Sequence, residues 1–181
     1  MKIIGICGEP STGKTSLMRE IMNALSVEWI HERFKTLDYL HDERHVVLGK
    51  YSGEYFDGTD SLSMAVVVDA EAFIQGMVLK AIGDVVLFEG DRLFCQRFLQ
   101  ACLRATKMCR FVQLSYSSDT FLARRAERVK NGIVQAETFI KSRRTKYNNL
   151  RAAFPLIEVM MNNNLDDQKK IINNLIEWIN E

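Results

Sequence analysis

A glycine-rich stretch that directly follows an apolar run near the N-terminus constrains the possible folds more than any other feature. The apolar run covers residues 2–7, and the stretch reads Gly8-Glu9-Pro10-Ser11-Thr12-Gly13-Lys14-Thr15. It fits the pattern Gly-x4-Gly-Lys-Thr, in which the glycines let the backbone curl so that successive N–H groups point at one anion. The pattern requires a buried strand before it and a helix after it. Both are expected here, because apolar residues recur on one face of residues 13–25.

This loop predicts a binding site for a nucleoside triphosphate. Nine residues are expected to surround the phosphates: Gly8, Glu9, Pro10, Ser11, Thr12, Gly13, Lys14, Thr15 and Ser16. The helix beginning at Lys14 adds the positive end of its dipole to the loop. Lys14 is expected to reach the terminal phosphates, and the hydroxyl of Thr15 to bind Mg²⁺. ATP and Mg²⁺ are therefore the predicted ligands.

Apolar runs alternate with amphipathic stretches along the rest of the chain. Strands are expected at residues 2–7, 34–40, 46–48, 84–89, 110–115 and 156–160, and helices from residue 13 and at residues 69–82, 92–105, 118–130, 135–152 and 165–180. Strands that alternate with helices favour a parallel sheet covered on both faces. Residues 1–181 are therefore expected to form one α/β domain, a three-layer P-loop NTPase fold.

The composition argues against several other classes of protein. An apolar fraction of 47% with 26% charged residues is ordinary for a globular domain. No apolar run approaches the roughly 18 residues of a membrane span, and the short N-terminal run lacks the form of a signal peptide. Cys7, Cys95, Cys102 and Cys109 form no Cys-x-x-Cys pair, so burial is expected rather than a zinc site or disulfides. We expect a cytoplasmic protein without a membrane partner.

Charge is distributed unevenly along the chain. Residues 1–96 carry 9 Lys/Arg against 15 Asp/Glu, a net charge of −6, whereas residues 97–151 carry 13 against 3, a net charge of +10. Residues 152–181 carry 2 against 5, a net charge of −3. The basic segment predicts a surface for an anionic partner, and a solvated helix face is the alternative.

The remaining motifs favour one class among the proteins that share this loop. The guanine-reading string Asn-Lys-x-Asp and the switch string Asp-x-x-Gly of GTPases are both absent. Motor ATPases usually have an Asp-Glu pair after four apolar residues, whereas Leu87-Phe88 leads into Glu89-Gly90-Asp91. Small-substrate kinases instead carry an acid at a strand end opposite the loop, and Phe-Glu-Gly-Asp-Arg at residues 88–92 is similar to that element. Glu89 or Asp91 would then hold Mg²⁺ or accept a proton from the acceptor. A carboxylate that only caps a turn is the alternative for Glu89.

An arginine-rich helical lid is the second expectation for this class. The segment ARRAERVKNG (residues 123–132) resembles such a lid, and KSRRTKY (residues 141–147) supplies further cations. The planar guanidinium group pairs two phosphate oxygens at once and keeps its charge. We expect Arg124, Arg128 and Arg144 to contact the transferring phosphoryl group, within a lid of about residues 118–147.

Residues 49–64 lie where kinases of this class face the phosphate acceptor. This segment contains the aromatic residues Tyr55 and Phe56, which could stack on a base, and Asp57, which could take a proton from a hydroxyl group. An ordinary turn-rich loop is an equal alternative, since Asp-Gly is a common turn signal. Which of Glu89, Asp91 and Asp57 acts as the base stays open. Asn162-Asn163-Asn164 fits either a contact to adenine or a simple turn.

Four segments together resemble bacteriophage P-loop kinases that phosphorylate 5-hydroxymethyluracil in DNA. They read GEPSTGKTSLM, GEYFDGTDSLSMAV, FEGDRL and SRRTKYNNL, and they span Gly8 to about Leu150. The resemblance implies that the ATP γ-phosphate passes to the hydroxymethyl group of a base in DNA, as a step in base hypermodification. A flipped base would stack on Tyr55 or Phe56 while the strand lies on the basic segment. A phage-encoded chain would act in the host cytoplasm.

Two other hypotheses compete with the DNA kinase. The first is a kinase of a free nucleoside, nucleotide or other small hydroxyl-bearing metabolite, which shares every feature except the polymer. The second is a regulatory ATP-binding module, which would keep its function after Glu89→Gln or Asp57→Asn.

Overall fold

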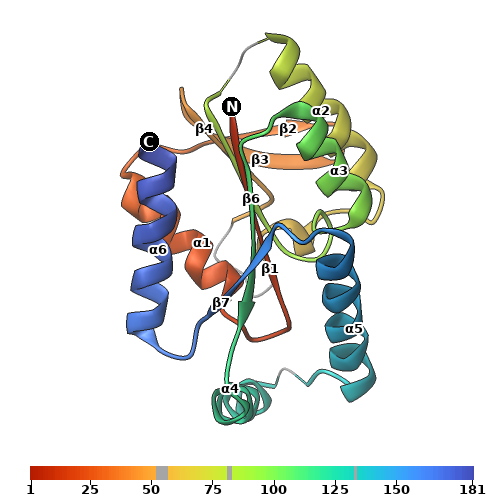
Figure 1. Ribbon diagram of the computed structural model, residues 1–181, viewed down its shortest axis with the longest axis vertical. Coiled ribbons are helices and arrows are strands. Elements are labelled where there is room, and N and C mark those ends of the chain that lie inside the picture. Colours follow the sequence, from red (N-terminus) through yellow and green to blue (C-terminus); the bar gives the residue numbers. More distant parts are fainter. Residues whose placement is uncertain (52–56, 81–82, 133) are drawn as a thin grey trace.

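The fold is one seven-stranded sheet between two layers of helices, as Figure 1 shows. The computed structural model describes residues 1–51, 57–80, 83–132 and 134–181. The strands are β1 (Lys2–Gly8), β2 (Ile30–Phe34), β3 (Leu37–His41), β4 (His45–Leu48), β5 (Val85–Glu89), β6 (Cys109–Ser115) and β7 (Ile157–Met161). The helices are α1 (Lys14–Leu25), α2 (Val66–Lys80), α3 (Gln96–Ala105), α4 (Ser118–Lys130), α5 (Glu137–Ala153) and α6 (Leu165–Asn180), with a short 3-10 turn, η1 (Thr59–Ser61).

The sheet brings the carboxyl ends of its central strands to one edge. Its strand order is β2-β3-β4-β5-β1-β6-β7, and neighbouring strands from β4 to β7 run parallel. Strands β1, β5 and β6 therefore end together, at Gly8, Glu89 and Ser115. Ligands of open α/β sheets bind outside these carboxyl ends. The expected α/β fold, with a mostly parallel sheet covered on both faces, is confirmed.

One part of the sheet differs from the fully parallel arrangement that the sequence predicted. The single strand expected at residues 34–40 is divided at Lys35 and Thr36 into the antiparallel hairpin of β2 and β3, and β3 also runs antiparallel to β4. Lys35 has a positive φ of 54° within this turn. A two-residue connection can join only antiparallel strands, because a parallel pair needs a crossover of a dozen or more residues.

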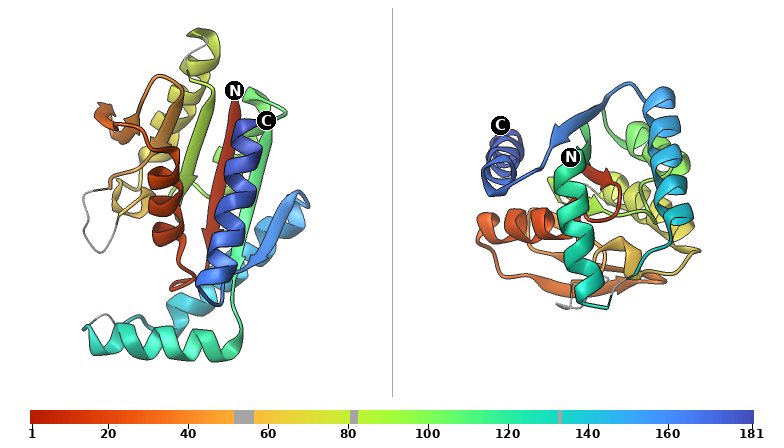
Figure 2. Two further views of the ribbon diagram at one scale, coloured as in Figure 1. Left: turned by 90° about the vertical axis from the view of Figure 1, so that its left-hand side faces the viewer. Right: turned by 90° about the horizontal axis from the view of Figure 1, so that it is seen from below.

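Each face of the sheet has its own hydrophobic core. Leu17 and Ile21 of α1 and Leu175 of α6 pack with side chains of β1 and β5 on one face. Helices α2, α3 and α5 cover the other face, and Figure 2 shows the two layers from the side. Helix α4 buries none of its residues and lies beyond the carboxyl ends of the strands, apart from both layers. Its position follows from its sequence, which is rich in arginine and lacks a broad apolar face.

Most element boundaries agree with the sequence prediction to within a few residues. The last helix was expected at residues 165–180 and is found there. Helix α3 was expected from residue 92 but begins at Gln96, because residues 90–95 form a turn in which the N–H of Phe94 donates to the carbonyl of Gly90. Cys7 and Cys102 are buried, and Cys95 and Cys109 are partly buried. No helix of the described residues is long and apolar enough to cross a membrane.

Gly5 provides a test of the packing at the centre of the sheet. Gly5 faces Phe88 across the β1–β5 pair, and a Cβ atom at position 5 would lie 2.4 Å from Cζ of that fully buried ring. We expect Gly5→Ala to lower the free energy of unfolding by about 1–3 kcal/mol, because neither the backbone nor the packed ring can move away cheaply. Urea denaturation measures this change.

Gly76→Ala is the matched control, since Gly76 lies inside α2 and a Cβ there would meet nothing within 4 Å. It should leave stability unchanged or raise it by about 0.5–1 kcal/mol, the usual gain of alanine over glycine in a helix. Equal stability of Gly5→Ala and the wild type would contradict this description of the core.

Candidate active site

The connection from β1 to α1 is a tight loop whose backbone depends on two glycines. Gly8 and Gly13 have φ values of 152° and 87°. A Cβ at Gly8 would lie 2.7 Å from the backbone oxygen of Leu114, and one at Gly13 would lie 2.8 Å from the amide nitrogen of Asn162. Neither position can accept a side chain without moving its neighbours, so both glycines of the pattern are required by geometry.

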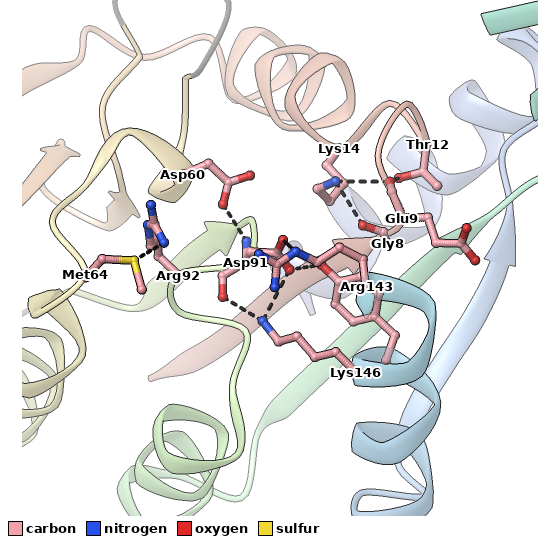
Figure 3. A network of polar contacts seen from close by, with 11 residues as sticks. Gly8, Glu9, Thr12, Lys14, Asp60, Met64, Asp91, Arg92, Arg143 and Lys146 are labelled. Carbon is pink, nitrogen blue, oxygen red and sulfur yellow. Dashed lines mark hydrogen bonds and ion pairs between the residues drawn. The ribbon is translucent and has the colours of Figure 1, made fainter. Parts of the chain in front are cut away.

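The ammonium group of Lys14 lies against its own loop. Its Nζ donates to the carbonyl oxygens of Gly8 at 3.0 Å and Glu9 at 3.3 Å, as Figure 3 shows. The hydroxyl of Thr12 donates to the same carbonyl of Glu9 at 2.8 Å. Carbonyl oxygens are weaker partners for an ammonium group than phosphate oxygens, because a phosphate oxygen carries a negative charge and a carbonyl oxygen is neutral. Lys14 is therefore placed to exchange these carbonyls for an anion in the loop.

The three asparagines after β7 support the loop and its surroundings. The buried amide of Asn162 donates to the backbone oxygen of Thr12 at 2.7 Å. The side-chain oxygen of Asn163 accepts from the N–H of Ser117 at 2.7 Å, and that of Asn164 accepts from the N–H of Asp167 as the cap of α6. The Asn162 amide thus links the end of β7 to the phosphate-loop backbone, a structural role that the sequence analysis missed.

Glu89 at the end of β5 lies beneath the first turn of α1. Its Oε1 accepts a hydrogen bond from the hydroxyl of Thr15 at 3.0 Å, and the side chain is only 1% exposed. Burial, the largest effect, raises the pKa of Glu89 from 4.5 to about 7. Lys14 opposes this shift, and the negative charges of Asp60 and Asp57 add to it.

Thr15 and Glu89 together fit a magnesium ion. A hydroxyl and a carboxylate oxygen are the hard oxygen ligands that Mg²⁺ prefers, and Mg²⁺ usually takes only one or two protein ligands beside water and phosphate oxygens. Negative charges that raise the pKa of Glu89 would also favour a cation beside it. Sequence reasoning named both residues for this role.

The segment from Asp57 to Asp60 packs tightly against the strand end that carries Glu89. A Cβ at Gly58 would lie 2.0 Å from Oε1 of Glu89, so only glycine fits there. The hydroxyl of Thr59 donates to the backbone oxygen of Glu89 at 2.6 Å, and the N–H of Asp91 donates to Oδ1 of Asp60 at 2.7 Å. These contacts fix the position of the segment relative to the phosphate loop.

Asp57 and Asp91 are both held by cations. Asp57 is 3% exposed and forms an ion pair with Arg19 of α1. Oδ2 of Asp91 lies 2.7 Å from Nε of Arg143, and its Oδ1 lies 3.2 Å from Nζ of Lys146. Figure 3 shows the cluster of Asp91, Arg143 and Lys146.

The protonation of Asp91 follows from this cluster. Burial acts to raise the pKa of Asp91, but Lys146, a hydrogen bond from the Tyr147 hydroxyl and Arg143 together lower it below its usual value. Asp91 is therefore an ionised anchor that fastens α5 to the end of β5.

The arginines expected in a lid reach the outer side of the phosphate loop. Arg144 donates to both carboxylate oxygens of Glu9, at 2.8 and 3.0 Å. Nη1 of Arg124 donates to the backbone oxygen of Ser11 at 3.1 Å. Arg128 is half-buried, and burial lowers its pKa. Arg124 and Arg144 thus connect helices α4 and α5 to the phosphate loop.

These groups surround one pocket with a volume of about 280 Å³. Its lining residues are Gly8, Pro10, Ser11, Gly13, Lys14, Thr15, Ser16, Asp57, Asp60, Asp91, Arg92, Arg128, Gln135, Phe139 and Arg143. Most of the residues predicted from the sequence are brought together here. Five of them lie outside the lining set and contact it indirectly, through hydrogen bonds within the loop, to the loop or to Thr15: Glu9, Thr12, Glu89, Arg124 and Arg144.

Some predicted contacts cannot be placed, and other residues at the pocket were not predicted. Tyr55 and Phe56, expected to stack on a base, lie outside the described residues. Arg144 contacts Glu9 and does not line the pocket. Sequence reasoning missed the pocket roles of Asp60 and Arg92, although both lie inside segments that it had singled out.

The fold and the pocket define a class of protein: a P-loop enzyme that transfers a phosphoryl group from a nucleoside triphosphate. The P-loop Nucleotide Kinase3 family matches residues 1–164, and the chain belongs to this family. The sequence-based prediction of a P-loop kinase is thereby confirmed at the level of the family. No curated protein sequence matches the chain.

Two solved structures show the same fold at low identity. An unliganded sugar kinase from Janibacter sp. HTCC2649 is similar with a TM-score of 0.54 and 9% identity, over 99% of this chain and 95% of that chain. Shikimate kinase from Bacteroides thetaiotaomicron is similar with a TM-score of 0.51 and 14% identity, over 99% of both chains. At these identities the likeness concerns the fold alone.

The raised pKa of Glu89 makes a prediction for stability. Because its folded pKa of about 7 lies above the ordinary value of 4.5, this carboxyl group favours the folded state most below pH 4.5. The contribution is lost as the pH rises through about 7, to an extent on the order of 3 kcal/mol. Glu89→Gln should remove this dependence, so the variant should be more stable than the wild type at pH 8 but not at pH 4.5. Urea denaturation at both pH values measures the difference.

Glu20→Gln, at an exposed position of α1, serves as the control and should follow the wild type at both pH values. If Glu89→Gln destabilised the protein at pH 8, the conclusion that burial of the ionised Glu89 carboxylate costs stability would be wrong.

Proposed function

We propose that this chain transfers the γ-phosphoryl group of ATP to a hydroxyl group of a small acceptor, with Mg²⁺ as cofactor. The observation that carries this proposal is the convergence of Lys14, the carboxylates of Asp57 and Asp91, and Arg128 on one pocket. Phosphoryl transfer needs this combination, since its catalysis consists mostly of positioning and of stabilising negative charge.

Each part of the pocket has a distinct task in this proposal. The loop N–H groups and Lys14 bind the β- and γ-phosphates, and Thr15 and Glu89 hold Mg²⁺. When bound, Mg²⁺ supplies positive charge to the phosphate oxygens. Arg128 lines the pocket and would stabilise the negative charge that develops on the transferring phosphoryl group. Arg124 and Arg144 position helices α4 and α5 through their hydrogen bonds to Ser11 and Glu9.

The chemical step forms one bond and breaks one. The acceptor oxygen bonds to the γ-phosphorus as the bond from that phosphorus to the β–γ bridging oxygen breaks, and ADP leaves. The acceptor's proton passes to a carboxylate at the pocket wall. Among the three candidates from the sequence, Asp91 is engaged by Arg143 and Lys146, and Glu89 lies under Thr15. Asp57 lines the pocket, as Asp91 does, and is held by its ion pair with Arg19.

A small acceptor is favoured over a polymer by the distribution of charge in the fold. Several cations of residues 97–151 pair with acids from the other parts of the chain: Arg97 with Glu71, Arg110 with Glu158, Arg143 and Lys146 with Asp91, and Arg144 with Glu9. Five of its 13 cations thus pair with four acids from outside the segment, which neutralise part of its net charge of +10. Much less of it is available to a DNA backbone than the sequence suggested.

Phosphorylation of 5-hydroxymethyluracil in DNA is the second candidate. It is favoured by Phe-Asp-Gly-Thr-Asp at residues 56–60, the most distinctive part of the resemblance to phage DNA-base kinases, because Asp57 and Asp60 of this segment line the pocket. The family match and the solved structures support a kinase without supporting this substrate.

Labelled ATP separates these candidates. We expect label to reach free nucleosides, nucleotides or other small alcohols when each is offered with ATP and Mg²⁺. Transfer only to duplex DNA that contains 5-hydroxymethyluracil would instead establish the second candidate. Binding of ATP without transfer to any acceptor would indicate the regulatory module.

Lys14→Ala tests the role of the phosphate loop. Loss of this cation should lower kcat/KM for phosphoryl transfer by about 100- to 1,000-fold, because a charge that stabilises the transition state is removed from a partly enclosed site. Steady-state kinetics with labelled ATP measures the loss. Lys107→Ala, at an exposed position before β6, is the matched control and should retain wild-type activity. An active Lys14→Ala enzyme would rule out the proposed use of the loop.

A further inference from the structure

Asp60 differs from the other carboxylates of the pocket in the partners that hold it. Asp57 pairs with Arg19, and Asp91 pairs with Arg143 and Lys146. Asp60 instead accepts a hydrogen bond from the backbone N–H of Asp91 through Oδ1, and no cation of the described chain forms an ion pair with it. Its position is fixed by a neutral donor, and its second oxygen is left for a ligand in the pocket that it lines.

Arg92 likewise differs from Arg143, another cation that lines the pocket, in the partners that hold it. Arg143 is engaged by Asp91, whereas Arg92 has no carboxylate partner within the described residues. Its Nε is buried and has no hydrogen-bond partner there, and its Nη1 lies against the sulfur of Met64. A buried guanidinium N–H without an acceptor is costly, and an anion in the pocket would supply that acceptor.

Asp60 and Arg92 lie together on one side of the site. The backbone of Asp91 connects them, since it donates to Asp60 and directly precedes Arg92. In Figure 3 both side chains lie on the far side of Asp91 from Glu9 and Thr12 of the phosphate loop. The triphosphate and the pair of Asp60 and Arg92 can therefore occupy different halves of one pocket.

We propose that Asp60 and Arg92 form the acceptor half of this pocket, and that the acceptor carries both the reacting hydroxyl group and a phosphate group. Asp60 accepts the hydrogen bond of the hydroxyl and receives its proton as the oxygen bonds to the γ-phosphorus. Arg92 binds the acceptor's phosphate through its planar fork of N–H groups. This inference rests on the proposed kinase activity and narrows its substrate to nucleotides, either free or within a polymer, rather than nucleosides or uncharged alcohols.

The charges of the pocket support this division. Lys14 and Arg128 serve the triphosphate in the proposed function, and Arg143 is balanced by Asp91. Arg92 is then the cation that remains for a second anion. Asp60, in the same half of the pocket, would repel that anion and accept the hydrogen bond of the hydroxyl group instead, which orients the acceptor.

Binding of inorganic phosphate tests the Arg92 half without knowledge of the natural acceptor. The protein is saturated with Mg²⁺ and a non-hydrolysable ATP analogue, and phosphate is added while its binding is followed by ³¹P NMR. We expect a second anion site that is weakened at least about tenfold by Arg92→Gln and unchanged by Arg104→Gln, an exposed control on α3. Absence of phosphate binding to the wild type, or equal binding to Arg92→Gln, would overturn this half of the proposal.

Kinetics test the Asp60 half. Matched nucleosides, their 5′-monophosphates and short oligonucleotides, each with and without a 5-hydroxymethyluracil base, are offered as acceptors. The wild type should prefer phosphate-bearing acceptors, and the comparison of monophosphates with oligonucleotides separates the two sources of the phosphate. Asp60→Asn should lower kcat about 100-fold or more and leave the affinity for the ATP analogue within about threefold. Arg92→Gln should mainly raise KM for the acceptor.

Asp84→Asn, an exposed variant before β5, is the matched control and should keep wild-type kcat. A wild type that transfers phosphate to no acceptor contradicts the proposed function, and the phosphate titration still decides the role of Arg92. A wild type that is active while Asp60→Asn retains its kcat, or that uses nucleosides as well as nucleotides, contradicts only the present inference.

Discussion

The close approach of the β1–α1 loop to the neighbouring strand ends is the constraint on which the rest of the site depends. Gly8 packs against Leu114 of β6, and Gly13 packs against Asn162, which holds the backbone of Thr12. These contacts leave the loop curled, with Lys14 directed at the carbonyls of Gly8 and Glu9. Because the loop is shaped by packing between strands, its conformation does not depend on a ligand, and binding a triphosphate need not order it.

A second set of contacts places the proposed catalytic groups around that loop. Glu89 reaches Thr15, Gly58 and Thr59 reach Glu89, and Asp91 gathers Asp60, Arg143 and Lys146. Residues 89–91, at the end of β5, thus connect α1, the segment from Asp57 to Asp60, and α5. A rigid strand end is suited to this task, since sites built on regular elements are positioned more accurately than sites on long loops.

The fold and the phosphate loop could be predicted from the sequence because they depend on local patterns. The apolar strand before Gly8, the helix after Gly13 and the strand ending at Glu89 each follow from periodicity and spacing. The antiparallel hairpin was missed because Lys35 and Thr36 carry no strong turn signal, although their backbone reverses the chain.

Local sequence patterns could not predict which charged residues pair with one another in the folded chain. Arg144 was expected on the phosphoryl group and instead contacts Glu9, 135 residues away in sequence. The net charge of residues 97–151 likewise suggested a binding surface for a polyanion, whereas several cations of this segment form ion pairs with acids elsewhere in the chain. Asp60 and Arg92 could be proposed as site residues only from the structure, which shows that Asp57 is paired with Arg19 and Asp91 with Arg143.

A crystal structure with Mg²⁺ and a non-hydrolysable ATP analogue tests the central claim most directly. We expect the phosphates to lie within the loop from Gly8 to Thr15. The Lys14 ammonium should leave the carbonyls of Gly8 and Glu9 for phosphate oxygens, and Mg²⁺ should lie beside Thr15 and Glu89. A nucleotide bound elsewhere, or a Lys14 that keeps its carbonyl partners beside a bound triphosphate, would contradict the central claim.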